Sequence, residues 1–194
     1  EALQKAVRMD GPSILLSFDP HPRTWFNPND PVFLLTPPAI KAELVSYLGI
    51  SAMAIHTFND DFSSLSAEDF LNQIIVEKMG ARYVITGEDF HFGRKRQGTP
   101  QYLQQAGERL GFGVSLVPAR KDNQGLVISS SRIREHLEKG EIKQANELLG
   151  YAYRISGTVI EGKKLGRTLG FPTANIALSQ NNRLKHGIYA VRVI

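Results

Sequence analysis

The feature that most constrains the fold of this chain is an alternation of short apolar runs with helix signals over residues 13–137. The runs at residues 13–18, 83–85 and 114–117 have the length and the continuous hydrophobicity of buried strands, and a further apolar stretch covers residues 50–58. Helix signals separate these runs. Such alternation predicts an α/β fold, in which helices cover both faces of a parallel sheet.

The helices between these runs have explicit start and stop signals. A helix with its N-cap at Thr36 is expected to carry Ile40, Leu44 and Leu48 on one face and to end at Gly49. Three more helices are expected from start signals at Ser66 with Asp69, at Thr99 with a stop near Gly111, and at Ser131 with a face that reaches Leu137.

The pattern changes after residue 150. Residues 154–160 alternate between apolar and polar, a glycine-rich turn follows, and residues 187–191 form another β-branched run. These signals predict antiparallel strands. We therefore expect two domains, residues 1–150 of α/β type and residues 151–194 of β type. The helical spacing at the start and the apolar run at the end lead us to expect that both ends are cut from longer domains.

Composition excludes several classes of function. The chain has no cysteine, so disulfides, thiolate nucleophiles and cysteine metal sites are excluded, which favours a cytoplasmic location. No apolar run approaches the roughly 20 residues that span a bilayer. The formal net charge of +4 suits a phosphate-rich small molecule better than duplex DNA. We expect no nucleic-acid or membrane partner, and the oligomeric state stays open.

Ligands of open parallel sheets bind beyond the carboxyl ends of the strands, so the loops that follow strands are the candidate sites. Residues 18–22 read Phe-Asp-Pro-His-Pro, in which two prolines fix the backbone and present a ring and an imidazole. This loop suits a flat heteroaromatic ligand. A rigid turn with one solvated histidine explains the same residues.

A second loop covers residues 87–98 and holds two phenylalanines, two acids and three cations between glycines. Aromatic rings stack on bases and cations neutralise phosphates, so this loop could face a nucleotide. The alternative is a solvated basic hairpin whose Phe90 and Phe92 fill the core.

A third loop holds a serine cluster at a helix start, with Arg134 one turn after Ser131. Unpaired backbone amides, hydroxyls and a guanidinium on one face make an anion site that suits a polyphosphate. Ordinary helix capping explains one serine of the cluster.

The β segment contains a glycine-rich stretch at residues 162–175 that ends in Phe-Pro-Thr-Ala-Asn. Closely spaced glycines let backbone amides approach phosphates, and the oxygens of Thr173 and Asn175 are hard ligands for Mg²⁺. The alternative is a β-turn with solvated charges. The glycines do not form a Walker A pattern, which disfavours a P-loop kinase.

Together these motifs resemble the prokaryotic bifunctional riboflavin kinase/FAD synthetase (FMN adenylyltransferase) family. Residues 18–22 resemble its flavin-side loop, and residues 87–93 its Gly-x-[Asn/Asp]-Phe-x-Phe-Gly segment. The serine cluster resembles its Ser-Ser-Thr-x-x-Arg triphosphate motif, with Ser131 in place of Thr. Residues 169–175 match its kinase motif.

The resemblance implies a Rossmann-like nucleotidyltransferase sheet without its first strand, followed by the start of a small antiparallel β-barrel. It implies phosphorylation of riboflavin to FMN and adenylylation of FMN to FAD, with ATP as co-substrate and Mg²⁺ as cofactor. The family's His-x-Gly-His segment and its downstream catalytic Glu do not occur in residues 1–194. The chain by itself is therefore expected to be incomplete for both reactions.

The resemblance also assigns roles to individual residues. Catalytic roles fall on His21, Asp89 and Arg134, and triphosphate binding falls on Ser130, Ser131 and Arg134. Flavin binding falls on Phe18, Pro20, His21, Pro22 and Phe26. The kinase nucleotide would be bound by Gly162, Gly166, Arg167, Gly170 and Pro172, and Mg²⁺ by Thr173 and Asn175.

Two alternatives remain open. One is another adenylyltransferase of the same fold, acting on pantetheine phosphate or nicotinate mononucleotide, which would not need the motif at residues 169–175. The other is a non-catalytic nucleic-acid-binding module that uses Arg94, Lys95 and Arg96, and it predicts a steep fall of binding with salt.

Overall fold

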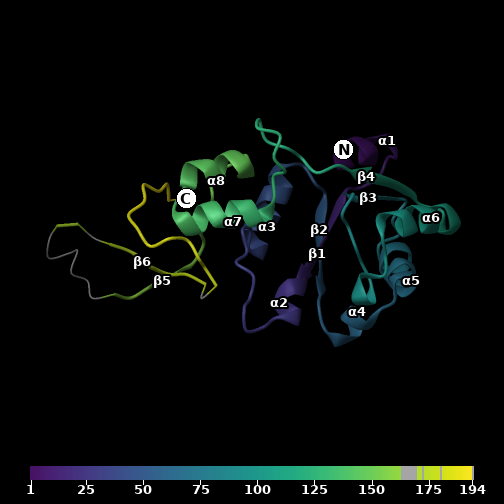
Figure 1. The fold of residues 1–194 in the computed structure, drawn as a ribbon, viewed down its shortest axis with the longest axis horizontal. Helices are drawn as coiled ribbons and strands as arrows, with labels where there is room; N and C mark the ends of the chain where they lie inside the picture. The colour runs from purple at the N-terminus through teal and green to yellow at the C-terminus, as the bar shows by residue number, and fades with distance from the viewer. Residues whose placement is uncertain (163–169, 172, 180, 194) are drawn as a thin grey trace. The chain divides into compact units, whose positions relative to one another are not determined.

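The computed structural model describes residues 1–162, 170–171, 173–179 and 181–193, and the chain folds into two compact units (Figure 1). The first unit comprises Glu1–Asp30 and Leu44–Val127, and the second comprises Pro31–Glu43 and Ile128–Ile194. The chain passes from one unit to the other inside helix α3 (Pro38–Tyr47). Ile40 of this helix is buried, as expected for its apolar face. Leu48, which was expected on the same face, follows the end of the helix and is 63% exposed, so that part of the prediction is wrong.

The first unit contains two pairs of parallel strands. Strand β1 (Ile14–Asp19) pairs with β2 (Ala52–Thr57), and β3 (Tyr83–Gly87) pairs with β4 (Gly113–Val117). The predicted strands and their parallel pairing are confirmed. The expectation of one continuous sheet is not met, because the described residues form two separate two-stranded sheets.

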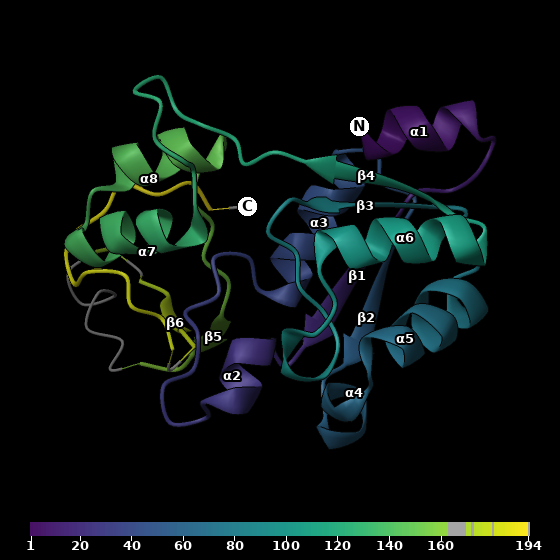
Figure 2. The same cartoon turned by 45° about the vertical axis from the view of Figure 1, so that its right-hand side comes forward.

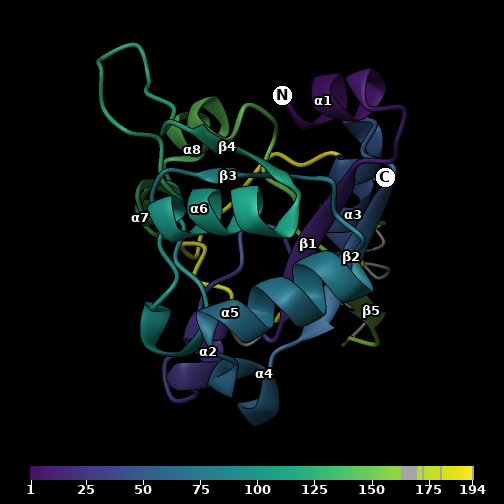
Figure 3. The same ribbon diagram turned by 90° about the vertical axis from the view of Figure 1, so that its right-hand side faces the viewer.

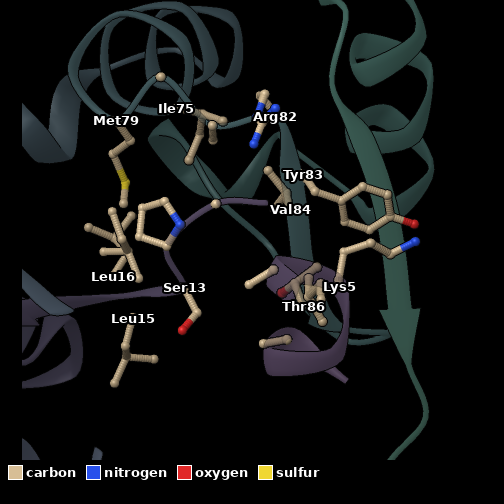
Figure 4. A pocket seen from close by; sticks show the side chains of 18 of the residues that line it. Lys5, Ser13, Leu15, Leu16, Ile75, Met79, Arg82, Tyr83, Val84 and Thr86 are labelled. Atoms are coloured by element: carbon tan, nitrogen blue, oxygen red, sulfur yellow. The ribbon is translucent and has the colours of Figure 1, made fainter. Parts of the chain in front are cut away.

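An apolar cavity of about 400 Å³ is lined by residues of both β1 and β3, the strands of the two sheets that do not pair with each other. Figure 4 shows Leu16 of β1 and Val84 of β3 among its side chains. At its margin Lys5 Nζ lies 4.0 Å from the centre of the Tyr83 ring.

Two helices of the first unit begin at the expected signals, and α3 begins at Pro38, one residue later than an N-cap at Thr36 predicts. Ser66 Oγ accepts a hydrogen bond from Asp69 N at the start of α5 (Ala67–Asp69), which continues as a π-helix, η1 (Phe70–Lys78). Thr99 caps α6 (Pro100–Leu110), which ends at Gly111 in the left-handed region. The remaining helices are α1 (Ala2–Arg8), α2 (Pro22–Phe26), α4 (Asp60–Ser64) and the 3₁₀ turn η2 (Arg94–Arg96).

The core of the first unit lies between η1 and α6, which Figures 2 and 3 show side by side. Leu71 of η1 and Leu103 of α6 are almost fully buried. Phe92 and Phe112 pack into the same cluster from the loops before and after α6. Burying a side chain of this size stabilises a fold by roughly 1.5–3 kcal/mol, so this core fixes the loops that follow β3.

The second unit is built on α7 (Ser130–Lys139) and α8 (Ile142–Leu149), each of which ends at a glycine with positive φ. Its core holds Phe33, Ile133, Leu137 and Ala145. Strand β5 (Thr158–Ile160) lies within the run expected to form a strand, and its pairing is antiparallel as predicted. Its partner is β6 (Asn175–Ala177), which the sequence did not predict to be a strand.

Residues 187–191 form no strand, so that expectation is wrong. A strand needs a hydrogen-bonding neighbour, and no described segment pairs with these residues. Ile188 and Val191 are accordingly exposed despite their high strand propensity.

Candidate functional site

The loop after β1 holds the first group of candidate residues. His21 is the N-cap of α2, and its Nδ1 accepts a hydrogen bond from Arg23 N at 3.1 Å. Pro22 occupies the first position of this helix, where a missing N–H costs nothing. The Asp19–Pro20 peptide bond is cis. The structure therefore gives His21 a capping contact and a fixed position at the carboxyl end of β1.

Aromatic rings surround the same loop. The centre of the Phe18 ring lies 5.3 Å from that of Phe62 and 6.1 Å from that of Phe58, and Phe26 lies 5.7 Å from Phe58. Phe58 is buried, whereas Phe26 is 71% exposed. Phe26 thus presents a ring on which a flat ligand could stack, supported from behind by Phe58.

The sequence reasoning missed Phe58 and Phe62. Phe58 directly follows β2, and its backbone N donates to Asp19 O at 2.9 Å, so it lies beside the candidate loop. The available signal was its position immediately after a strand, at the edge of the sheet where ligands bind.

The loop after β3, residues 87–98, resolves the alternatives for its two rings. Phe92 is 6% exposed, and Phe90 stacks on it with ring centres 5.4 Å apart, both within the core cluster. For Phe92 the alternative of a ring that fills the core is therefore confirmed, whereas Phe90 is only partly buried against that core. Asp89 and the cations of η2 are exposed.

The serine cluster lies in the second unit. Ser129, and not Ser131, is the N-cap of α7, and its Oγ accepts from Arg132 N at 3.3 Å. Ser130 and Ser131 are exposed in the first turn of the helix. Their hydroxyls and the helix N-terminus retain the features of an anion site.

Arg134 belongs to the same helix and is half-buried. Its Nε donates to Phe33 O at 2.6 Å, across 101 residues of sequence. The Phe33 ring packs edge-to-face against Tyr153 with 6.3 Å between centres, and burial raises the pKa of Tyr153 to about 12. The uncharged Tyr153 ring thus packs against Phe33, whose backbone carbonyl orients Arg134.

The candidate kinase residues lie around β5 and β6. Asn175 begins β6 opposite Ile160, and a Cβ at Gly162 would collide with the Asn175 side-chain amide. Gly162 therefore allows Asn175 to occupy this position. Thr173 is exposed. Gly170 has a φ of +79°, and Gly166, Arg167 and Pro172 lie outside the described residues.

The side-chain oxygens of Thr173 and Asn175 are of the kind that Mg²⁺ prefers, and nucleotide phosphates and water would have to complete its shell. Among the described residues, no group of three His, Cys, Asp or Glu side chains could hold a metal ion. No helix in the described part of the chain is long and apolar enough to cross a membrane.

The structure thus places the candidates in four groups, two in each unit. His21, Phe18 and Phe26 lie at the end of β1, and Asp89 lies at the end of β3, all in the first unit. The serine cluster with Arg134 and the kinase residues belong to the second unit.

Comparison with protein families decides between the alternatives. The sequence model of the FAD synthetase family matches residues 1–132. The chain belongs to the FAD synthetase family. The riboflavin kinase family model matches the next segment, residues 149–194.

Several related proteins carry the name bifunctional riboflavin kinase/FMN adenylyltransferase. The protein from Buchnera aphidicola of Schizaphis graminum is 38% identical over 181 residues, which cover 93% of this chain and 58% of that protein. The Listeria monocytogenes protein is 38% identical over 99% of this chain and 61% of its own length. The Escherichia coli K12 protein is 32% identical over 94% of this chain and 58% of its own length.

A solved structure has the same architecture as this FAD synthetase family chain. A Streptococcus pneumoniae crystal structure, described as a macrolide-efflux protein, superposes with a TM-score of 0.78 and 29% identity. The superposition covers 93% of this chain and 58% of that one. The chain spans about three-fifths of the length of the curated relatives that it matches.

Proposed function

We propose that this chain is the FMN-adenylylating part of a bifunctional flavin enzyme, together with the beginning of its riboflavin kinase part. One observation carries the proposal: the FAD synthetase model at residues 1–132 is followed in the same chain by the riboflavin kinase model at residues 149–194. The relatives that match over most of this chain are named for both activities. A cytoplasmic location remains a prediction from the cysteine-free sequence.

In adenylyl transfer, a phosphate oxygen of FMN attacks the α-phosphorus of ATP, and the bond from that phosphorus to the β-phosphate oxygen breaks. FAD and pyrophosphate are the products. The chain contributes position and charge, since such reactions need no covalent enzyme intermediate. Ser130, Ser131 and the N-terminus of α7 would hold the triphosphate, with Arg134 oriented by Phe33 O. The exposed Phe26 and the fixed His21 would receive the flavin and its phosphate.

In riboflavin phosphorylation, the 5′-hydroxyl oxygen attacks the γ-phosphorus of ATP, ADP leaves, and the hydroxyl proton is lost. Asn175, which lies over Gly162, and Thr173 would hold Mg²⁺ together with the nucleotide. When bound, the metal neutralises charge on the transferring phosphoryl group. The remaining nucleotide contacts are proposed for Gly162, Gly166, Arg167, Gly170 and Pro172.

The Rossmann-like sheet is part of the same proposal. Each parallel pair is joined through helices, β1 to β2 by way of α3 and β3 to β4 by way of α6. Helix α1 precedes β1, and its Ala2, Lys5 and Ala6 line the cavity between β1 and β3. A right-handed strand–helix–strand unit would therefore place a further parallel strand before α1, in this cavity.

Hydrogen exchange in the full-length protein tests this strand. The proposal expects slow exchange along both β1 and β3, because each would be paired at both edges. Exchange at the rate of an open edge in either strand would contradict it.

The family matches bear on both alternative functions. An adenylyltransferase for pantetheine phosphate or nicotinate mononucleotide does not account for the riboflavin kinase match at residues 149–194. A nucleic-acid-binding module does not account for either family match.

Quenching of FMN fluorescence tests the proposed substrate. The full-length protein should quench FMN saturably, and Mg²⁺ with a non-hydrolysable ATP analogue should change the apparent affinity for FMN. The control titration uses nicotinate mononucleotide as a competitor, which should not displace FMN. Displacement by nicotinate mononucleotide, or no quenching by folded protein, would contradict the proposal.

A further inference from the structure

Glu68 accepts hydrogen bonds from both helices that enclose the core of the first unit. It lies in α5, and its Oε2 accepts from the Tyr102 hydroxyl and from Arg109 Nη2, each at 2.6 Å. Its Oε1 accepts from Asn72 Nδ2 of η1 at 3.3 Å. Tyr102 and Arg109 belong to α6, so one carboxylate ties α6 to the helix formed by α5 and η1.

The charge on Glu68 is secure at neutral pH. The hydrogen bond from Arg109, followed by that from Tyr102, lowers the pKa of Glu68 to about 2. The Arg109 and Glu68 side chains are 55% and 37% exposed, and an exposed ion pair alone contributes little to stability. Three donors on one carboxylate instead hold it in a single geometry, which suits a group that fixes the position of others.

The ring of Phe92 lies between the elements that Glu68 joins. Its centre is 6.2 Å from the Tyr102 ring on α6 and 5.3 Å from the Phe70 ring on η1. Tyr102 therefore has two contacts: its hydroxyl binds Glu68, and its ring packs against Phe92. Phe92 in turn is the buried anchor of residues 87–98.

The backbone of the same loop rests on the residues just before Glu68. Arg94 N donates to Leu65 O at 2.7 Å. Gly93 has a φ of +71°, and a Cβ there would lie 2.6 Å from Ala67 N, so a larger residue would push the loop away. These contacts hold the loop, which includes the exposed Asp89, against the segment of residues 65–67.

We propose that Glu68 is a positioning residue for the adenylyl-transfer site: it fixes Tyr102 against Phe92 and so holds residues 87–98, with Asp89, at the end of β3. This inference rests on the function proposed above. Glu68 itself touches neither flavin nor nucleotide in this account.

Trypsin reports the position of the loop without any assay of activity, because Arg94, Lys95 and Arg96 are exposed cleavage sites within it. Glu68→Gln removes the charge and keeps the shape, and Tyr102→Phe keeps the ring and removes the hydroxyl. Glu43→Gln is the matched control, since it breaks an exposed 2.8 Å pair with Arg154 in the second unit.

We expect native full-length protein with Glu68→Gln to be cleaved at residues 94–96 roughly tenfold faster than the parent, because hydrogen bonds to a charged carboxylate are stronger than those to a neutral amide. Tyr102→Phe should be intermediate, and Glu43→Gln should match the parent. Cleavage no faster than in the control, or equally faster at sites throughout the chain, would overturn the proposal.

Steady-state kinetics of the same variants give a second test. Glu68→Gln should raise KM for FMN in FAD formation roughly tenfold, with a smaller change in kcat and with riboflavin phosphorylation unchanged. Faster cleavage at the loop with unchanged KM and kcat would overturn the positioning role. A parent protein that forms no FAD would refute the proposed function, and the trypsin result would still decide whether Glu68 holds the loop.

Discussion

Arg134 shows what the structure adds to a sequence motif at the scale of one residue. The motif places a guanidinium one turn into a helix, which is enough to predict an anion site. The motif does not predict that Arg134 Nε donates a hydrogen bond to Phe33 O, because these two residues are 101 positions apart in the sequence. Since the guanidinium is a planar fork, one bond from Nε sets the direction of the whole group.

Arg134→Ala should impair FAD formation from FMN and spare FMN formation from riboflavin. The variant removes charge stabilisation from the adenylyl-transfer site alone, and loss of one such donor commonly costs roughly 100-fold in rate. The measurement is kcat/KM for each reaction in the full-length protein, with Arg132→Ala as the control. Equal loss of both activities would refute the assignment of Arg134 to one reaction.

Thr173→Ala or Asn175→Ala should have the reverse effect. Each removes an oxygen proposed to bind Mg²⁺, so riboflavin phosphorylation should fall at least about tenfold while adenylylation of supplied FMN persists. Thr173→Ser keeps the hydroxyl and should retain more activity than Thr173→Ala. Equal rates for parent, Ala and Ser variants at limiting Mg²⁺ would mean that Thr173 is no ligand.

At the scale of elements, apolar runs and capping residues predicted most strands and helices of the first unit. The runs became β1, β3 and β4, and the signals at Ser66 and Thr99 became helix starts. The run at residues 187–191 failed because strand formation depends on a partner that no local pattern reveals. The sequence left open whether Phe92 fills the core, because its burial depends on its packing against Phe70 of η1 and Tyr102 of α6.

The Glu68 network makes the link between α5 and α6 sensitive to acid. Its lowered pKa means that the stabilisation is present above the ordinary glutamate range near 4.5 and is lost as pH falls towards about 2. The Tm difference between the parent and Glu68→Gln should therefore be greatest near neutral pH and narrow below about pH 4.5. A difference that stays constant from pH 7 to pH 3 would show that the charge on Glu68 contributes nothing.

At the scale of the whole molecule, the order of the motifs was predictable and their spatial grouping was not. The change of pattern after residue 150 agrees with the antiparallel pair β5–β6. The compact units follow a different division, because Pro31–Glu43 packs with the chain after Ile128. That grouping arises from the burial of Phe33 and Ile40, contacts that sequence spacing does not encode.

We propose that this chain belongs to an enzyme that makes FAD from FMN. Chromatography of the flavins, after the full-length protein is incubated with FMN, ATP and Mg²⁺, tests this directly when pyrophosphate is assayed alongside. We expect FAD and pyrophosphate to appear in equal amounts and no FAD to form without ATP. Folded protein that consumes ATP and leaves FMN unchanged would contradict it.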